Sequence, residues 1–157
     1  MPPFYDVYAR IPAGNWADAL AHFVDRYVAV EQPNEPRLPA VLRTYVESAP
    51  MDGDEGVLAE LRPDPSTSHA FSIYLEAKSH AGASITITEE SELVLGLSLD
   101  DPDNSAAVWE EGRRLLEDLM KEFRAIEGMT GVELPPPHSA SAWDDALLSL
   151  THVRYST

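Results

Sequence analysis

The chain has 157 residues, 27 of them acidic and 11 basic, which gives a formal net charge of -16 at pH 7. Apolar residues make up 44% and charged residues 24%, a composition typical of a folded domain and not of a disordered chain. Cysteine is absent, which excludes disulfides, thiolate zinc sites and cysteine nucleophiles. Neither a secretory leader nor a run of eighteen apolar residues is present, so we expect one cytoplasmic domain over residues 1–157.

The first two elements are predicted from their apolar spacing. Residues 4–11 alternate between apolar and polar side chains, which predicts a β-strand. Asn15 can then cap a helix that we expect to reach about Val30, because its apolar residues recur every three or four positions. Three prolines in residues 31–39 predict a connector, since proline can neither continue a helix nor sit in a central strand.

The middle of the chain is predicted to be a series of strands with short links, which favours antiparallel neighbours. These segments are residues 41–48, 57–62, 70–78, 84–89 and 93–100.

A long amphipathic helix is predicted next, beginning near Ser105 and ending at Gly128. After it we expect a short strand at 130–134, a proline-rich spacer at 135–140, a short helix from Ser141 to Leu150, and a last edge strand at 152–156.

Together these elements predict an α+β fold with a single, mainly antiparallel sheet of five to seven strands. Two main amphipathic helices should pack on one sheet face and leave the other free. The alternation places Tyr8, Tyr45 and Tyr74 on that free face among mixed charges. They are candidates for a recognition surface, although ordinary half-buried sheet aromatics would show the same pattern.

Motifs for catalysis, phosphate binding or metal binding are missing. The sequence has no GxSxG, no GxxxxGK[ST], no GxGxxG and no HExxH. Two acidic loops, at 51–56 and 100–105, contain oxygen ligands, but neither matches an EF-hand, and carboxylates before a helix are also favoured by the helix dipole. We therefore expect no catalytic residues, no metal and no cofactor.

The acidic residues are concentrated in the middle third of the chain. Residues 51–105 contain twelve acidic and two basic side chains. Such a field attracts basic partners and repels nucleic acids and anionic membranes, although host composition alone would also explain it. The candidate partner-binding residues are Asp52, Asp54, Glu55, Glu89, Glu90, Glu92, Asp100, Asp101, Asp103, Tyr45 and Tyr74.

These observations favour a non-catalytic binding or inhibitory protein that recognises a basic protein partner. Small acidic domains of mixed strand and helix are similar in general character to bacterial toxin-immunity proteins. This similarity concerns the class of protein only and involves no shared sequence motif. Two alternatives stay open. One is a small-molecule pocket or minor enzyme site between sheet and helices, and the other is a self-associating module, such as a homodimer.

Overall fold

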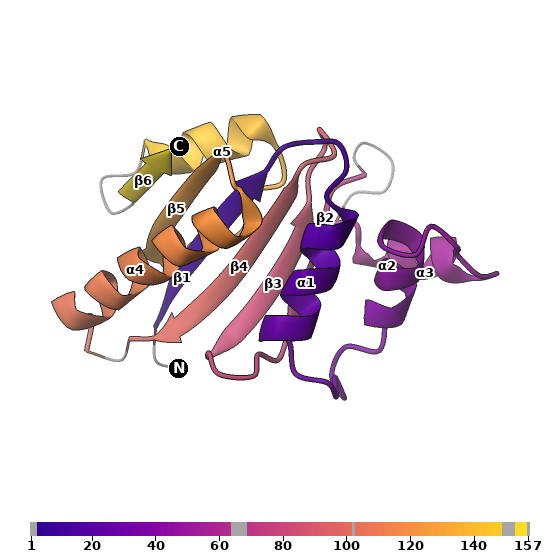
Figure 1. Ribbon diagram of the computed structural model, residues 1–157, viewed down its shortest axis with the longest axis horizontal. Helices are drawn as coiled ribbons and strands as arrows, with labels where there is room; N and C mark the ends of the chain where they lie inside the picture. The colour runs from indigo at the N-terminus through magenta and orange to yellow at the C-terminus, as the bar shows by residue number, and fades with distance from the viewer. Residues whose placement is uncertain (1–2, 64–68, 102, 149–152, 157) are drawn as a thin grey trace.

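The computed structural model describes residues 3–63, 69–101, 103–148 and 153–156, the last four by backbone only. Within these residues the elements are β1 (Phe4–Ile11), α1 (Ala17–Tyr27), α2 (Leu38–Tyr45), α3 (Asp54–Leu61), β2 (Phe71–Leu75), β3 (Gly82–Ile87), β4 (Leu93–Asp100), α4 (Ala106–Phe123), β5 (Glu127–Val132), α5 (Ala140–Leu147) and β6 (Val153–Ser156). The strands form one sheet in the order β2-β3-β4-β1-β5-β6 (Figure 1). Every neighbouring pair is antiparallel, which confirms the predicted α+β fold.

Helices α1 and α4 cover one face of the sheet, as predicted (Figure 1). In β1, Tyr5, Val7 and Ala9 point toward these helices and belong to the main hydrophobic core. Both helices bury one apolar face against that core. Helix α4 begins where the Ser105 hydroxyl accepts a hydrogen bond from the backbone N–H of Val108, 3.3 Å away.

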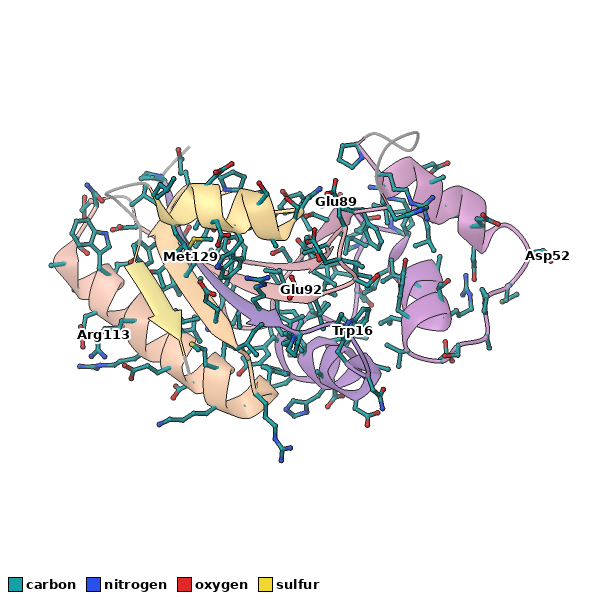
Figure 2. The ribbon with its side chains drawn as sticks, turned by 90° about the horizontal axis from the view of Figure 1, so that it is seen from above. Trp16, Asp52, Glu89, Glu92, Arg113 and Met129 are labelled. Carbon is teal, nitrogen blue, oxygen red and sulfur yellow. The ribbon has the colours of Figure 1, made fainter. Side chains whose placement is uncertain are left out.

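The opposite face, which we call the far face, is partly covered instead of free. Helix α5 lies there, on the other side of the sheet from α1 and α4 (Figure 2). A second apolar cluster is buried beneath it and contains Tyr8, Val94, Met129, Leu134 and Trp143. The expectation of a free sheet face was therefore wrong for the part near β5, because the C-terminal helix carries a tryptophan that needs burial.

Two of the predicted strands are helices. Residues 41–48 and 57–62 were expected in the sheet, but residues 41–45 belong to α2 and residues 57–61 to α3, which lie beside its β2 edge (Figure 1). Short apolar runs fit a strand or a helix equally well by spacing alone. Here Pro39 stands in the first turn of α2, where its fixed φ favours a helix, and so the proline-rich connector ends sooner than predicted.

Other boundaries differ by a few residues. Helix α1 begins after Trp16 instead of at an Asn15 cap, and Trp16 is buried while its indole N–H donates to the Ser91 carbonyl, 2.9 Å away. Helix α4 ends at Phe123, because Arg124 takes the left-handed conformation. The strand expected at 130–134 is Glu127–Val132, which includes Gly128. None of the described helices is both long and apolar enough to cross a bilayer.

Candidate functional site

The predicted acidic residues lie in three separate places. One group stands at the start of α3, the second in the turn between β3 and β4, and the third at the end of β4 and in the link to α4. The second and third groups lie at opposite ends of β4, whose eight residues span about 26 Å. Figure 2 shows Asp52 at one tip of the molecule, well away from Glu89. These acids therefore do not form one continuous patch.

Three of the predicted contact residues are buried. Asp54, Glu92 and Asp101 have exposed fractions of 3%, 8% and 1%. The Asp54 carboxylate accepts two hydrogen bonds from the guanidinium of Arg43, at 2.7 and 2.9 Å, and one from the backbone N–H of Met51. The Arg43 hydrogen bonds lower the pKa of Asp54 to about 2. This carboxylate joins α3 to α2 and is not available to a partner.

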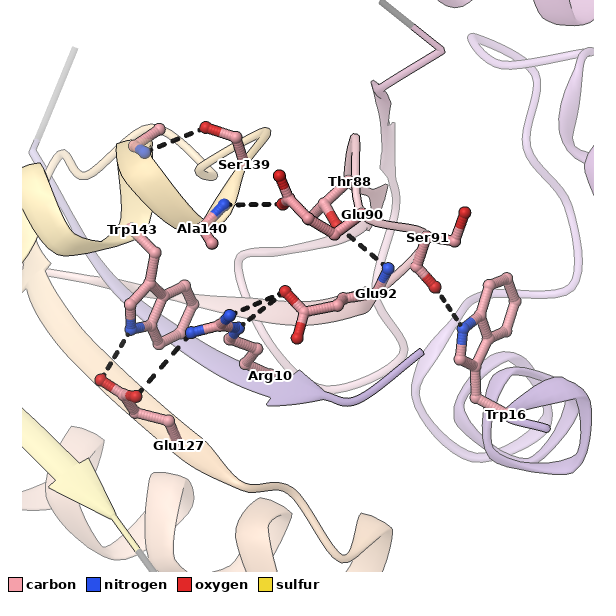
Figure 3. A network of polar contacts seen from close by, with 11 residues as sticks. Arg10, Trp16, Thr88, Glu90, Ser91, Glu92, Glu127, Ser139, Ala140 and Trp143 are labelled. Atoms are coloured by element: carbon pink, nitrogen blue, oxygen red, sulfur yellow. Dashed lines mark hydrogen bonds and ion pairs between the residues drawn. The ribbon is translucent and has the colours of Figure 1, made fainter. Parts of the chain in front are cut away.

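Glu92 belongs to a polar network on the far face (Figure 3). The guanidinium of Arg10 donates to Glu92 at 2.8 and 3.0 Å and lies 3.8 Å from Glu127. The indole N–H of Trp143 donates to Glu127 at 2.9 Å, and the Arg10 guanidinium lies 5.6 Å from the Trp143 ring centroid. The network therefore attaches α5 to the sheet.

The remaining predicted acids are exposed: Asp52, Glu55, Glu89, Glu90, Asp100 and Asp103. Glu90 also accepts a hydrogen bond from the backbone N–H of Ala140 at 2.7 Å.

The two tyrosines among the candidate partner-binding residues lie in different surroundings. Tyr45 lies on α2 and packs between Trp16 and Phe71, with ring centroids 5.9 and 6.0 Å away, whereas Tyr74 lies on β2 and is 64% exposed.

The two acidic loops do not gather metal ligands. Within the described part of the chain, no three His, Asp or Glu side chains are placed to hold a metal ion. One oxygen of Asp101 accepts the backbone N–H of Ser105 at 2.8 Å, the interaction expected of a carboxylate just before a helix.

A cleft on the far face brings together residues that the sequence analysis did not group. It lies at the end of the sheet where β2 ends and β3 begins, and the chain after β5 forms one of its walls. Its volume is about 360 Å³. The described residues that line it are Phe4, Asp6, Tyr8, Tyr74, Leu75, Ala81, Gly82, Ala83, Ser84, Ser98, Glu133, Leu134, Pro135 and Pro136. We call it the Asp6 cleft.

Asp6 is the half-buried carboxylate of this cleft. One of its oxygens accepts the Ser98 hydroxyl at 2.6 Å, and the other accepts the backbone N–H of Leu134 at 2.8 Å. Burial raises the pKa of Asp6, and the nearby charge of Glu133 raises it further, while the two hydrogen bonds oppose these effects. The carboxylate is thus held in place by neutral donors and has a like charge as its neighbour.

Tyr8 forms the inner wall of the cleft. Its hydroxyl donates to the Leu134 carbonyl, and burial raises its pKa, so the phenol stays neutral. Tyr74 stands on the opposite side with its ring largely exposed. The pKa of Tyr74 is also raised, first by partial burial and then by the charge of Asp6.

The sequence contained only part of the signal for this cleft. Alternation in the first strand placed Asp6 and Tyr8 on one face, and Tyr74 was recognised as a candidate. The wall formed by Glu133 to Pro136 comes from more than 120 positions away along the chain. Only the pairing of β1 with β5 brings that wall to Asp6, and no local pattern encodes this pairing.

The alternative hypothesis places a pocket between the sheet and the helices, a layer that also holds the main hydrophobic core. Fully buried side chains from α1, α4 and the sheet fill that layer, among them Leu20, Phe23, Leu95, Leu97, Leu116 and Leu119.

Comparison of the chain with models of known protein families, with curated proteins and with solved structures finds no match.

Proposed function

We propose that this protein is a non-catalytic binding or inhibitory protein that recognises a basic protein partner. One observation carries the proposal: among the described side chains, exposed acids that form no ion pair outnumber the basic side chains that could offset them. The negative charge of these exposed acids is therefore not neutralised by neighbouring basic side chains.

Among the side chains that the structure describes, six arginines have acidic partners within 4.0 Å, namely Arg10, Arg26, Arg37, Arg43, Arg113 and Arg114. Several of their partners are buried or half-buried, as Glu92 is for Arg10 and Asp54 is for Arg43. Each of these arginines already has an acidic partner, so it does not offset the acids that form no ion pair.

The exposed acids are spread over several elements. Within the described residues, those that form no ion pair with a basic side chain include Asp52, Glu55, Glu89, Asp100, Asp103, Glu111, Asp118, Asp144 and Asp145. A field of one sign over so much of the surface increases the association rate with an oppositely charged protein and excludes partners of the same sign. Binding of this kind weakens as salt screens the charges.

A titration with defined peptides tests the proposal. A labelled peptide of alternating Arg and Gly is titrated with the protein by fluorescence anisotropy, and an alternating Glu and Gly peptide serves as the matched control. We expect binding of the Arg peptide alone, and a loss of affinity between low salt and the physiological ionic strength of about 0.15 M.

A second control separates the folded surface from composition alone. A polyglutamate peptide with the same net charge of -16 presents the charge without the fold. The proposal requires the folded protein to bind the Arg peptide more tightly than polyglutamate does. Equal affinity for the two, or binding that does not respond to salt, would contradict it.

A further inference from the structure

We propose that the Asp6 cleft is the binding site for one cationic side chain, Lys or Arg, of the basic partner. This inference rests on the proposed function and adds to it a defined anchor point. The charge of the cleft, its open acceptor positions, its aromatic walls and its size all suit such a ligand.

The Asp6 cleft has negative charge and no counter-charge of its own. Its described lining contains the carboxylates of Asp6 and Glu133 and no Lys, Arg or His side chain. In this respect Asp6 differs from Asp54 and Glu92, which each have an arginine within 2.8 Å. A half-buried carboxylate beside a second acid is less stable when ionised, and a cation from outside would offset that cost.

Asp6 also has acceptor capacity left. An ionised carboxylate offers about four lone-pair positions, and Asp6 uses one on each oxygen, for Ser98 and for Leu134. These two bonds hold the carboxylate in one orientation, so a ligand would meet an ordered group. Hydrogen bonds from an ammonium or guanidinium to a carboxylate are among the stronger ones in proteins.

The aromatic walls suit the same ligand. Phe4, Tyr8 and Tyr74 all line the cleft, and Tyr74 remains 64% exposed. A Lys or Arg head group is attracted to an aromatic face, while its aliphatic stem gains from apolar contact with residues such as Leu75 and Pro135. At about 360 Å³ the cleft is near the lower limit of pockets that hold small ligands, roughly 300–1,000 Å³, which fits one side chain.

The test uses single-residue probes and NMR detection on the full chain. N-acetyl-argininamide and N-acetyl-lysinamide supply the cation, and N-acetyl-citrullinamide is nearly the same shape as the arginine probe without its charge. We expect the charged probes to shift the backbone amide signals of Asp6, Tyr74, Ser84, Ser98 and Leu134, and the citrulline probe to have little effect. Equal shifts from all three probes, or shifts confined to other surfaces, would overturn the assignment.

Three variants separate the cleft from the general field. Asp6→Asn should weaken binding of the arginine probe roughly tenfold or more, because a charged hydrogen bond is lost. Glu55→Gln removes the same charge at the exposed start of α3 and should leave binding nearly unchanged. Tyr74→Ala removes an exposed ring without disturbing the core, and it should weaken binding while the fold is retained. Equal effects from Asp6→Asn and Glu55→Gln, or no effect from Tyr74→Ala, would refute the cleft.

The outcome is distinguishable from failure of the proposed function. If the Arg and Gly peptide binds in a salt-dependent way while the single-residue probes miss the cleft, this inference fails and the proposed function stands. If putrescine binds the cleft much more tightly than the arginine probe, the ligand is a free amine and the assignment to a partner side chain is wrong.

Discussion

Tyr8 lies directly over Gly96, its partner across β1 and β4. A Cβ atom added at position 96 would lie 2.7 Å from the Tyr8 ring and 2.3 Å from the Ser84 hydroxyl oxygen. The absence of a side chain at this position therefore makes room for both cleft residues, and it lets the Tyr8 hydroxyl reach the Leu134 carbonyl.

Gly96→Ala should therefore destabilise the protein. The added methyl group must displace Tyr8, which typically costs about 1–3 kcal/mol in a well-packed region. Urea unfolding would measure the loss, and Gly82→Ala is the matched control, because a Cβ there meets only ordinary contacts near 3.9 Å. Equal stability of the two variants would contradict the packing described for Tyr8.

Replacing Gly112 in α4 by alanine should also destabilise, although alanine is the better helix former. Its Cβ would lie 2.5 Å from the ring of Tyr5. Gly56→Ala in α3 provides the comparison, because nothing lies within 4 Å of its Cβ, and this variant should gain about 0.4–1 kcal/mol. The two glycine variants should thus change the thermal midpoint in opposite directions, and a shared direction would show that Tyr5 can move aside.

Arg10→Met tests the network that attaches α5 to the sheet. The variant leaves Glu92 without its cation in a nearly buried position, and breaking such a pair costs about 3 kcal/mol. Adding Glu92→Gln removes the stranded charge and should recover part of the loss. Urea denaturation of the single and double variants measures both effects, and a double variant less stable than Arg10→Met would argue against this account.

The Asp54 and Arg43 pair predicts a dependence of stability on pH. The folded pKa of Asp54 is about 2, below its ordinary 3.8, so the native state stabilises the ionised carboxylate. This contribution is fully present above the unfolded pKa and is lost as the pH falls toward 2. Unfolding midpoints measured from roughly pH 5 to pH 2 should fall less steeply for Asp54→Asn and for Arg43→Gln than for the wild type. Parallel curves for all three proteins would rule out a role for this pair.

The titration of Asp6 predicts a pH dependence for the cleft. Since its pKa lies above the ordinary 3.8, binding of the arginine probe should weaken as the pH falls through that raised value, when the carboxylate becomes protonated. A series of probe titrations on the acidic side of neutrality would measure this. Affinity that stays constant until the protein unfolds would exclude Asp6 as the counter-ion.

The success of sequence reasoning depended on how far apart the interacting residues lie. The first strand, the hairpins of β3 and β4, and the long helix were predictable, because each has enough residues to show its period. Residues 41–48 and 57–62 were assigned wrongly, since a short apolar run has no reliable period. Their helical state depends on packing that only the assembled fold provides.

The same limit applies to the candidate site. Charge predicts exposure on average, so the sequence places Asp54 and Glu92 on the surface. Arg43 is eleven positions from Asp54, and Arg10 is 82 positions from Glu92, so neither pairing follows from local sequence. The Asp6 cleft needed an even longer connection, from β1 to the chain that follows β5.

The central place of β1 in the sheet has a consequence for biosynthesis. During synthesis, β1 finds its two neighbours only when β4 and β5, which begin at residues 93 and 127, have also been made. Until then its apolar side chains have no sheet to join, and such long-range pairing slows folding and exposes the nascent chain to aggregation.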